Sequence, residues 1–181
     1  MLTLPTTLSE AMAGIDWNTE TTSGAQRIVF FADNYVVKYD PAETSNRNEL
    51  AWYDRVPSQV AECHALEIDV DLSAYGDLFG HFLVMERAEN VGDEDVLEDY
   101  CCWECSGADE LDLLCSDDLH SGNIGTMPDG RLVAIDMGCC HPTSREQGYF
   151  GTRYSNMRNM IAAIAEAFGV DSERIPEHYA N

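Results

Sequence analysis

The sequence predicts an α+β protein with two lobes: an antiparallel sheet carrying one helix, then a truncated and mostly helical lobe. Runs of β-branched and aromatic residues, separated by turn residues, fall between 19 and 87. Beyond residue 88 the apolar residues mostly recur at helical spacing. A polar stretch that contains glycine, 88–93, marks the boundary. The expected domains are therefore 1–18 (a helical extension), 19–87 (the first lobe) and 88–181 (the reduced second lobe).

The first lobe is expected to open with a three-stranded meander. Residues 6–14 favour a short helix ahead of it. Two strands at 19–25 and 27–31 surround a Ser-Gly turn, and Asp33-Asn34 then turns the chain into a third strand at 35–39. This third strand carries Lys38, the one lysine of the 181 residues.

A helix is predicted directly after the meander. Pro41 ends the third strand, Ser45 is placed to cap the helix, and Pro57 stops it. Its apolar positions recur at helical spacing at Leu50, Tyr53 and Val56. Glu49 is therefore expected beside the buried face.

Two further strands, at 64–72 and 79–86, complete the predicted five-stranded sheet. The second is nearly all apolar, which is typical of a central strand. Beyond the boundary, 94–103 combines acidic residues with an apolar stripe and favours a helix.

The rest of the second lobe contains a hairpin and a helix. The segments 123–127 and 131–135 flank Pro-Asp-Gly, a sequence typical of hairpin turns. Residues 154–168 place apolar side chains on one helical face, and Gly169 stops this helix.

The net charge of −23 narrows the classes of partner. With 33 acidic against 10 basic residues, the surface repels nucleic acid and anionic membranes. Three explanations of the acidity stay open: a high-salt cytoplasm, imitation of DNA toward a basic protein partner (a viral strategy), or the composition of the lineage.

The termini and the cysteines predict a cytoplasmic protein. The first 15 residues lack the features of a signal peptide, and no run of about 18 apolar residues is present. The seven cysteines are expected to be reduced thiols. Six of them, with His141, leave a zinc site open as the alternative to small core side chains: Cys101, Cys102, Cys105, Cys115, Cys139 and Cys140.

Five polar residues have an order and spacing suited to phosphoryl transfer. Lys38 lies on a strand and Glu49 follows eleven residues later, on the helix. Asp118 and Asn123 belong to Asp-Leu-His-Ser-Gly-Asn, and Asp136 belongs to Ile-Asp-Met-Gly. Taken singly, each loop residue has a turn or capping role as its alternative. The loss of every other lysine indicates that an ammonium is needed at position 38.

Each residue of this set has a chemical task. An ammonium on a rigid strand binds phosphates, and a carboxylate such as that of Glu49 orients it. Asp118 would accept the proton of an attacking hydroxyl. Asn123 and Asp136 would bind Mg²⁺, because the hairpin between them returns the chain and lets both oxygens converge.

These motifs resemble the protein-kinase-like superfamily, and in character the aminoglycoside-phosphotransferase-type and phage-encoded kinase-like proteins. The resemblance covers about residues 19–140 and rests on six segments: Gly24-Ala-Gln-Arg27, Val36-Val37-Lys38, Asn48-Glu49, Leu83-Val84-Met85-Glu86, Asp118-Leu-His-Ser-Gly-Asn123 and Ile135-Asp-Met-Gly138. It implies a two-lobed fold with ATP between the lobes. The adenine would be held by backbone groups around Glu86 and Ala88, and Gly24 would cover the phosphates.

The resemblance has three departures. Gly24 is the one glycine where the family has several, Ser116-Asp117 replaces the usual residues before the catalytic aspartate, and some 43 residues follow Gly138. The expected function is an ATP- and Mg²⁺-dependent kinase that phosphorylates a hydroxyl of a small molecule or a protein. Two alternatives stay open: a nucleotide-binding pseudokinase acting as a regulatory interaction module, and an acidic mimic that binds a basic partner.

Overall fold

A computed structural model describes residues 3–17, 22–23, 27–75, 78, 80–90, 121–138 and 157–171. The predictions made for Gly24, for the helix at 94–103, for Asp118 and for the possible zinc site lie outside these ranges. The described elements are α1 (Leu8–Ala13), β1 (Thr22–Ser23), β2 (Ile28–Phe31), β3 (Tyr35–Asp40), α2 (Thr44–Arg55), β4 (Cys63–Ala65), a 3₁₀ turn (Ser73–Tyr75), β5 (His81–Glu86), β6 (Glu89–Asn90), a second 3₁₀ turn (Ser121–Asn123), β7 (Ile124–Thr126), β8 (Leu132–Ala134) and α4 (Met157–Ala167).

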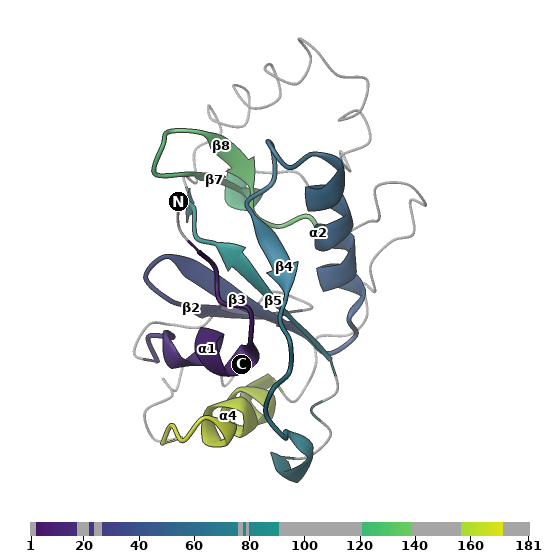
Figure 1. The fold of residues 1–181 in the computed structure, drawn as a ribbon, viewed down its shortest axis with the longest axis vertical. Helices are drawn as coiled ribbons and strands as arrows, with labels where there is room; N and C mark the ends of the chain where they lie inside the picture. Colours follow the sequence, from purple (N-terminus) through teal and green to yellow (C-terminus); the bar gives the residue numbers. More distant parts are fainter. Residues whose placement is uncertain are drawn as a thin grey trace.

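An antiparallel five-stranded sheet forms the middle of the fold, in the order β1-β2-β3-β5-β4 (Figure 1). The α+β class and the antiparallel sheet are therefore confirmed. β3 lies at the centre, paired with β2 on one side and β5 on the other. Its residues from Val36 to Asp40 are all buried, on both faces of the sheet, which explains the continuous apolar run.

The alternation along these strands divides the side chains between two cores. Phe30, Val37, Phe82 and their neighbours on one face belong to the core that includes α1 and α4. On the opposite face, Val36 and Met85 belong to the core that includes Trp52 of α2 and the hairpin β7-β8. Lys38 lies on this second face, since its strand neighbours Val37 and Tyr39 point into the first core.

One strand is shorter than the sequence predicts. β4, Cys63–Ala65, contains two residues of the expected 64–72. Of the expected strand at 19–25 the structure describes Thr22 and Ser23, which form β1, so its full extent stays a prediction. Beyond β4 the chain crosses α1 instead, where Leu8 donates to the carbonyl of Glu67 (2.8 Å). The apolar residues Leu66 and Leu72 are buried in the core below the sheet without being in a strand.

The start of α2 differs from the sequence prediction. Ser45 does not cap the helix, because it lies inside the first turn and is buried. The N-cap position belongs to Glu43, whose backbone has a φ of 63° and whose side chain makes no capping bond. Asp40, at the end of β3, takes over: its carboxylate accepts from the amides of Ser45 (2.7 Å) and Asn46 (3.1 Å). β3 and α2 are thereby fixed to each other.

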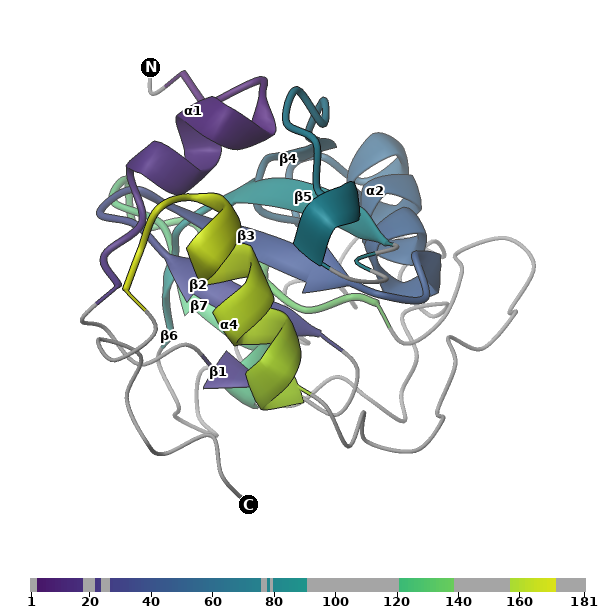
Figure 2. The same cartoon turned by 90° about the horizontal axis from the view of Figure 1, so that it is seen from below.

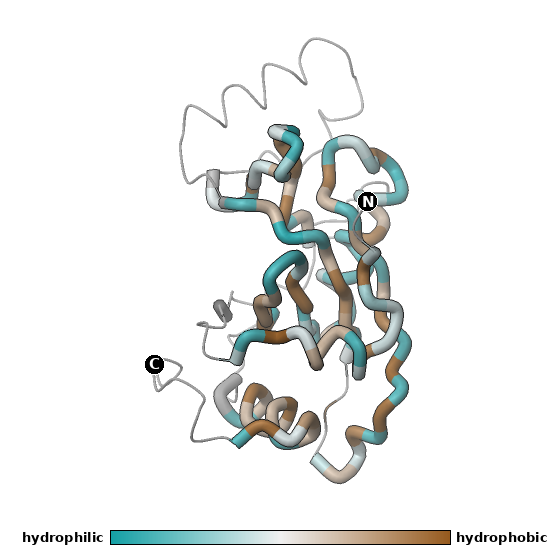
Figure 3. The backbone as a smooth tube through the Cα atoms, turned by 60° about the vertical axis from the view of Figure 1, so that its left-hand side comes forward, coloured by the Kyte–Doolittle hydropathy of each residue, from teal (hydrophilic) through white to brown (hydrophobic). Residues whose placement is uncertain are grey.

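Both ends of the described chain cover the same face of the sheet. Both α1 and α4 lie below the sheet in Figure 1, and in the view from below α4 crosses in front of the strands (Figure 2). Ile161 and Ile164 of α4 are buried with Leu8 and Met12 of α1 in one core. Apolar and more polar positions alternate along α4 (Figure 3), as expected for a helix with one buried face. The boundary between two lobes stays a prediction, since 91–120 and 139–156 are outside the described ranges.

A small second sheet, β6-β7-β8, lies against the other face. β8 also pairs with the segment after α2, where the amide of Ala134 donates to the carbonyl of Gln59 (2.7 Å). The predicted hairpin is present, with Gly130 at φ 86° in its turn. This hairpin positions Asn123 just before β7 and Asp136 just after β8. No helix among the described residues has the length and apolar character needed to cross a bilayer.

Candidate functional site

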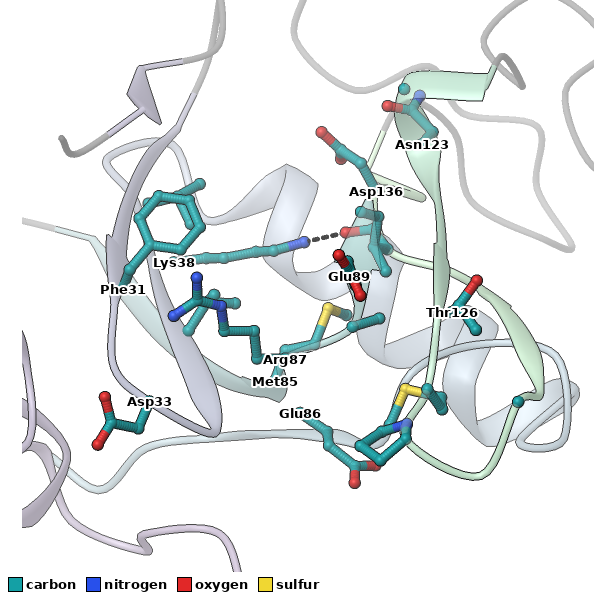
Figure 4. A pocket seen from close by; sticks show the side chains of 18 residues that line it. Phe31, Asp33, Lys38, Met85, Glu86, Arg87, Glu89, Asn123, Thr126 and Asp136 are labelled. Atoms are coloured by element: carbon teal, nitrogen blue, oxygen red, sulfur yellow. Dashed lines mark hydrogen bonds between the residues drawn. The ribbon is translucent and has the colours of Figure 1, made fainter. Parts of the chain in front are cut away.

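A cleft of about 1070 Å³ lies between the five-stranded sheet and the β7-β8 hairpin. Its residues come from β2, β3, β5, the segment after β5, and the hairpin. Lys38, Asn123 and Asp136 line it together with Glu86 and Ala88. Figure 4 shows Lys38 reaching across the cleft from the sheet toward the side on which Asn123 and Asp136 lie.

Lys38 is held by two acceptors. Its ammonium donates to Oε1 of Glu49 (2.8 Å) and to the carbonyl oxygen of Ile135 (2.5 Å), the bond marked in Figure 4. Lys38 is 4% exposed and Glu49 is fully buried, so each charge needs the other. The contact joins β3, α2 and the segment that carries Asp136.

Arg27, just before β2, is a third charged member of the site. Its guanidinium donates to Oε2 of Glu49, to Oδ1 of Asp136 and to Oδ1 of Asn46 (3.2 Å). Only 5% of the residue is exposed. The sequence motifs give no role to Arg27, although the pairing register of β2 and β3 indicates where its side chain lies. Ile28 pairs with Tyr39, so the register places Arg27 on the same sheet face as Lys38.

The segment that carries Asp136 is fastened to α2 at three points. The amide of Met137 donates to Oε1 of Glu49 (3.4 Å), and Nδ2 of Asn48 donates to the carbonyl of Gly138 (3.0 Å). A Cβ at Gly138 would lie 2.8 Å from Cβ of Ser45, so the segment approaches α2 as closely as only glycine permits. The glycine of Asp-x-Gly is therefore required here for a steric reason: no side chain fits between this segment and α2.

The pKa values in the site follow from burial and from these ion pairs. Burial acts to raise the pKa of Asp136, but the charges of Arg27 and Lys38 outweigh it and hold the pKa below its usual value. Burial acts to lower the pKa of Arg27, and the carboxylates of Asp136 and Glu49 outweigh it and raise the pKa. Asp136 is therefore an anion at neutral pH even though it lies beside a buried network. Its side chain is 50% exposed.

The cleft also has apolar walls. Val29, Val36, Met85, Met127 and Ile135 contribute its walls. A flat heteroaromatic ring fits such walls, and backbone groups would set its orientation. The amides of Glu86 and Arg87 already donate to the carbonyls of Glu62 (2.8 Å) and Asn34 (3.0 Å). Within the described residues the backbone amide of Ala88 makes no such bond.

The outer rim of the cleft is acidic. Asp33, Glu86 and Glu89 line it, and partial burial is the main cause that raises the pKa of Glu86. Arg87 is the counter-charge on this rim: it lies 5.4 Å from the ring centre of Phe31 and donates to the carbonyl of Ala32 (2.7 Å).

The donor set at Asn123 and Asp136 suits a hard cation. A carboxylate and an amide offer the oxygen ligands that Mg²⁺ prefers, and phosphates and water commonly complete its shell. Among the described residues, no group of three or more His, Cys, Asp or Glu side chains is placed to hold a metal. Asn123 and Asp136 would supply two of the ligands, and a bound phosphorylated molecule would supply others.

The structure thus brings together most of the residues that the sequence singled out. Lys38 and Glu49 are in contact, and Asn123, Asp136, Glu86 and Ala88 line one cleft. Gly24 and Asp118 lie outside the described residues.

Three solved structures of one protein, WbdD, are similar to this chain over most of its length. WbdD with the kinase inhibitor LY294002 is 16% identical, with 87% of this chain and 38% of that chain covered and a TM-score of 0.35. A 2.2 Å crystal structure of WbdD is 13% identical, with 90% of this chain and 39% of that chain covered and a TM-score of 0.35. A structure of the bifunctional kinase-methyltransferase WbdD is 14% identical, with 86% of this chain and 37% of that chain covered and a TM-score of 0.34.

The chain thus spans less than two fifths of the length of these structures. No protein-family model and no curated protein matches it. With TM-scores this low, the functional assignment has to rest on the site itself.

Proposed function

We propose that this protein is an ATP- and Mg²⁺-dependent phosphotransferase whose nucleotide occupies the cleft between the five-stranded sheet and the β7-β8 hairpin. The observation that supports the proposal is one arrangement. A buried strand lysine, paired with a buried helix glutamate, reaches across a partly apolar cleft toward an amide and an ionised carboxylate. A nucleoside triphosphate needs these same elements: apolar walls, a cation and metal ligands.

Each residue has a proposed task. The apolar walls receive the adenine, and the carbonyl of Glu86 with the amide of Ala88 orients it. Lys38, oriented by Glu49, binds the phosphates. Asn123 and Asp136 hold Mg²⁺, which when bound neutralises charge on the phosphates. Asp118, from its position before Asn123 in the chain, is proposed to accept the proton of the acceptor hydroxyl.

A second candidate function is nucleotide binding without turnover. It is favoured by one contact: Arg27 donates to Asp136, so a guanidinium already neutralises the carboxylate proposed to bind metal. A pseudokinase of this kind would act as a regulatory interaction module. If the protein is an active kinase, its acceptor is either a small molecule or a protein. A basic protein partner would suit the acidic surface of an active kinase and of a pseudokinase alike.

The nucleotide site is tested by thermal unfolding with and without Mg-ATP, at low and at molar salt. A ligand at about a hundred times its Kd adds about 2.7 kcal/mol to the free energy of unfolding. For a chain of this length the melting temperature should rise on the order of 5 to 10 °C. Lys38→Met and Asp136→Asn should each abolish the rise.

Asp129→Asn is the matched control for Asp136→Asn. Asp129 lies in the hairpin turn with its side chain 66% exposed, so this variant removes one carboxylate close in sequence without touching the cleft. It should keep the full rise. A well-folded wild-type protein that shows no rise at either salt would contradict the nucleotide site and leave the acidic surface as the functional feature.

Turnover separates the two candidate functions. The active kinase should form ADP from Mg-ATP, slowly with water as the acceptor and faster with the true one. Asp118→Asn should keep the Mg-ATP-dependent thermal shift but lower ADP formation by about a hundredfold or more, the usual contribution of a general base. A wild-type protein that binds Mg-ATP and forms no ADP would support the pseudokinase instead.

A further inference from the structure

The buried network around Glu49 contains a cation that the proposed reaction does not use. Arg27 spans Glu49 and Asp136 with its two terminal nitrogens, Nη1 and Nη2. Asn46 holds Nη1 from the side (3.2 Å), and Asn46 itself donates to the carbonyls of Lys38 (3.0 Å) and His81 (2.8 Å). The guanidinium therefore has a fixed position, set by β3, α2 and β5 together.

The charges of the network are balanced without any metal. The ion pairs join two carboxylates to two cations: Glu49 contacts both Arg27 and Lys38, and Arg27 also contacts Asp136. The buried carboxylate of Asp40 acts on Arg27 as well, without an ion-pair contact. Glu49 is fully buried and both cations are almost so. A free divalent ion that approaches Asp136 would meet a carboxylate whose charge Arg27 already offsets, at a distance where two cations repel each other strongly.

The carboxylate of Asp136 nevertheless remains open to the cleft, because half of its side chain is exposed. Arg27 approaches this carboxylate from the buried side, and Arg27 itself does not line the cleft. The two groups thus have separate places: the guanidinium behind Asp136, and the space in front of it free for a cation that arrives with its own negative ligands.

We propose that Arg27 is a positioning residue that fixes Asp136 and lowers its affinity for a free divalent cation, so that the cation enters together with the phosphates. The phosphates supply the negative charge that the balanced network lacks. This inference rests on the proposed function, since it concerns the metal of the same site.

Binding of Mn²⁺ alone tests the proposal, measured by electron paramagnetic resonance in moderate salt that screens the acidic surface. Arg27→Gln should bind Mn²⁺ at least about tenfold more tightly than the wild-type protein, a modest effect for a charge pair this close. The gain should vanish in Arg27→Gln/Asp136→Asn, which assigns it to Asp136. Arg27→Lys keeps the positive charge and should stay within about threefold of the wild-type protein.

A second comparison does not depend on how well Arg27→Gln folds. If Arg27 offsets the negative charge of Asp136, then Asp136→Asn should change the Mn²⁺ affinity of the nucleotide-free protein by less than about threefold. A loss of tenfold or more in Asp136→Asn would overturn the proposal, because Asp136 would then bind free metal with Arg27 in place. A folded Arg27→Gln that binds Mn²⁺ no more tightly than the wild-type protein would overturn it as well.

A purely structural Arg27 predicts lower stability without any gain in Mn²⁺ affinity, so the two roles give different results. The proposed function fails separately. Wild-type protein that is not stabilised by Mg-ATP would refute the nucleotide site while leaving the Mn²⁺ comparison between variants valid.

Discussion

At the scale of single residues, the site depends on how Glu49 divides its two oxygens. Oε1 accepts from Lys38 and from the amide of Met137, and Oε2 accepts from Arg27. A buried carboxylate is tolerable only when its lone pairs are used, and here all three partners come from different parts of the chain. Glu49 therefore fixes the distance between the sheet and the Asp136 segment.

Replacement of Gly138 tests how closely that segment must approach α2. A Cβ at this position would lie 2.8 Å from Cβ of Ser45 and 3.1 Å from Cζ of Arg27. Gly138→Ala should lower the free energy of unfolding by about 1 to 3 kcal/mol, the usual cost of overpacking. Urea denaturation measures the change.

A matched double variant separates steric crowding from other causes. Ser45→Gly removes the nearest atom, so Gly138→Ala/Ser45→Gly should lose less stability than the sum of the two single losses. Strict additivity would show that the contact with Ser45 does not limit the approach.

At the scale of elements, α2 is unusual because the buried side of its first half is polar. Ser45, Asn46, Asn48 and Glu49 are all buried there, whereas Leu50 and Tyr53, two of the three expected apolar positions, are only partly buried. Apolar packing is left to Trp52 and Val56 in the second half. The first half of α2 thus binds the Asp136 segment through the polar side chains of Asn48 and Glu49, a contact called the polar clamp below. The second half packs in the apolar core.

Asn48→Ala tests the clamp. The variant leaves the carbonyl of Gly138 without its side-chain donor, so it should cost about 1 to 3 kcal/mol of stability. It should also reduce the thermal shift with Mg-ATP, because Asp136 is two residues away. Arg47→Ala on the exposed side of α2 is the control, and it should change stability by less than about 0.5 kcal/mol. Equal effects of the two variants would contradict the clamp.

The elements that sequence patterns predicted are those with regular alternation and clear turn residues. β3, β5 and the β7-β8 hairpin fall within about two residues of the predicted ranges. β4 is short because, one residue beyond its end, Leu66 makes a last backbone bond to Phe82 of β5 and Glu67 then pairs with Thr7 ahead of α1. The cap of α2 was misassigned to Ser45, since the true capping carboxylate, Asp40, belongs to the preceding strand. Such a contact depends on tertiary geometry, which a local pattern does not contain.

The same distinction explains which site residues were found. Lys38, Glu49, Asn123 and Asp136 stand in motifs of characteristic spacing. Arg27 ends the segment Gly24-Ala-Gln-Arg27, in which only Gly24 has an expected role, and it contacts residues 22 and 109 positions away. Only the strand register, which requires the sheet pairing, indicates which face it occupies.

At the scale of the whole molecule, the sheet is covered on one side by the two ends of the described chain. Ile164 of α4 is fully buried in the core that includes α1 and β2. The cleft lies on the opposite side of the same sheet. The core of α1 and α4 and the cleft proposed to bind nucleotide thus lie on different faces of one set of strands.

Ile164→Ala should therefore lower stability without removing the site. The cavity it leaves should cost about 2 to 5 kcal/mol. The thermal shift produced by Mg-ATP should remain, starting from a lower melting temperature. Glu166→Gln, on the exposed side of the same helix, should leave both quantities unchanged. Complete loss of nucleotide binding in a folded Ile164→Ala would contradict the separation of the two faces.

The position of α4 also has a consequence during synthesis. The ribosome completes the last strand of the large sheet at residue 86, but the helix that covers it ends at residue 167. At about 5 to 20 residues per second, the sheet waits on the order of ten seconds with the α4 part of an apolar face uncovered. Nascent copies on one messenger can associate through such a face. The yield of soluble protein should therefore depend on the speed of translation as well as on the stability of the finished fold.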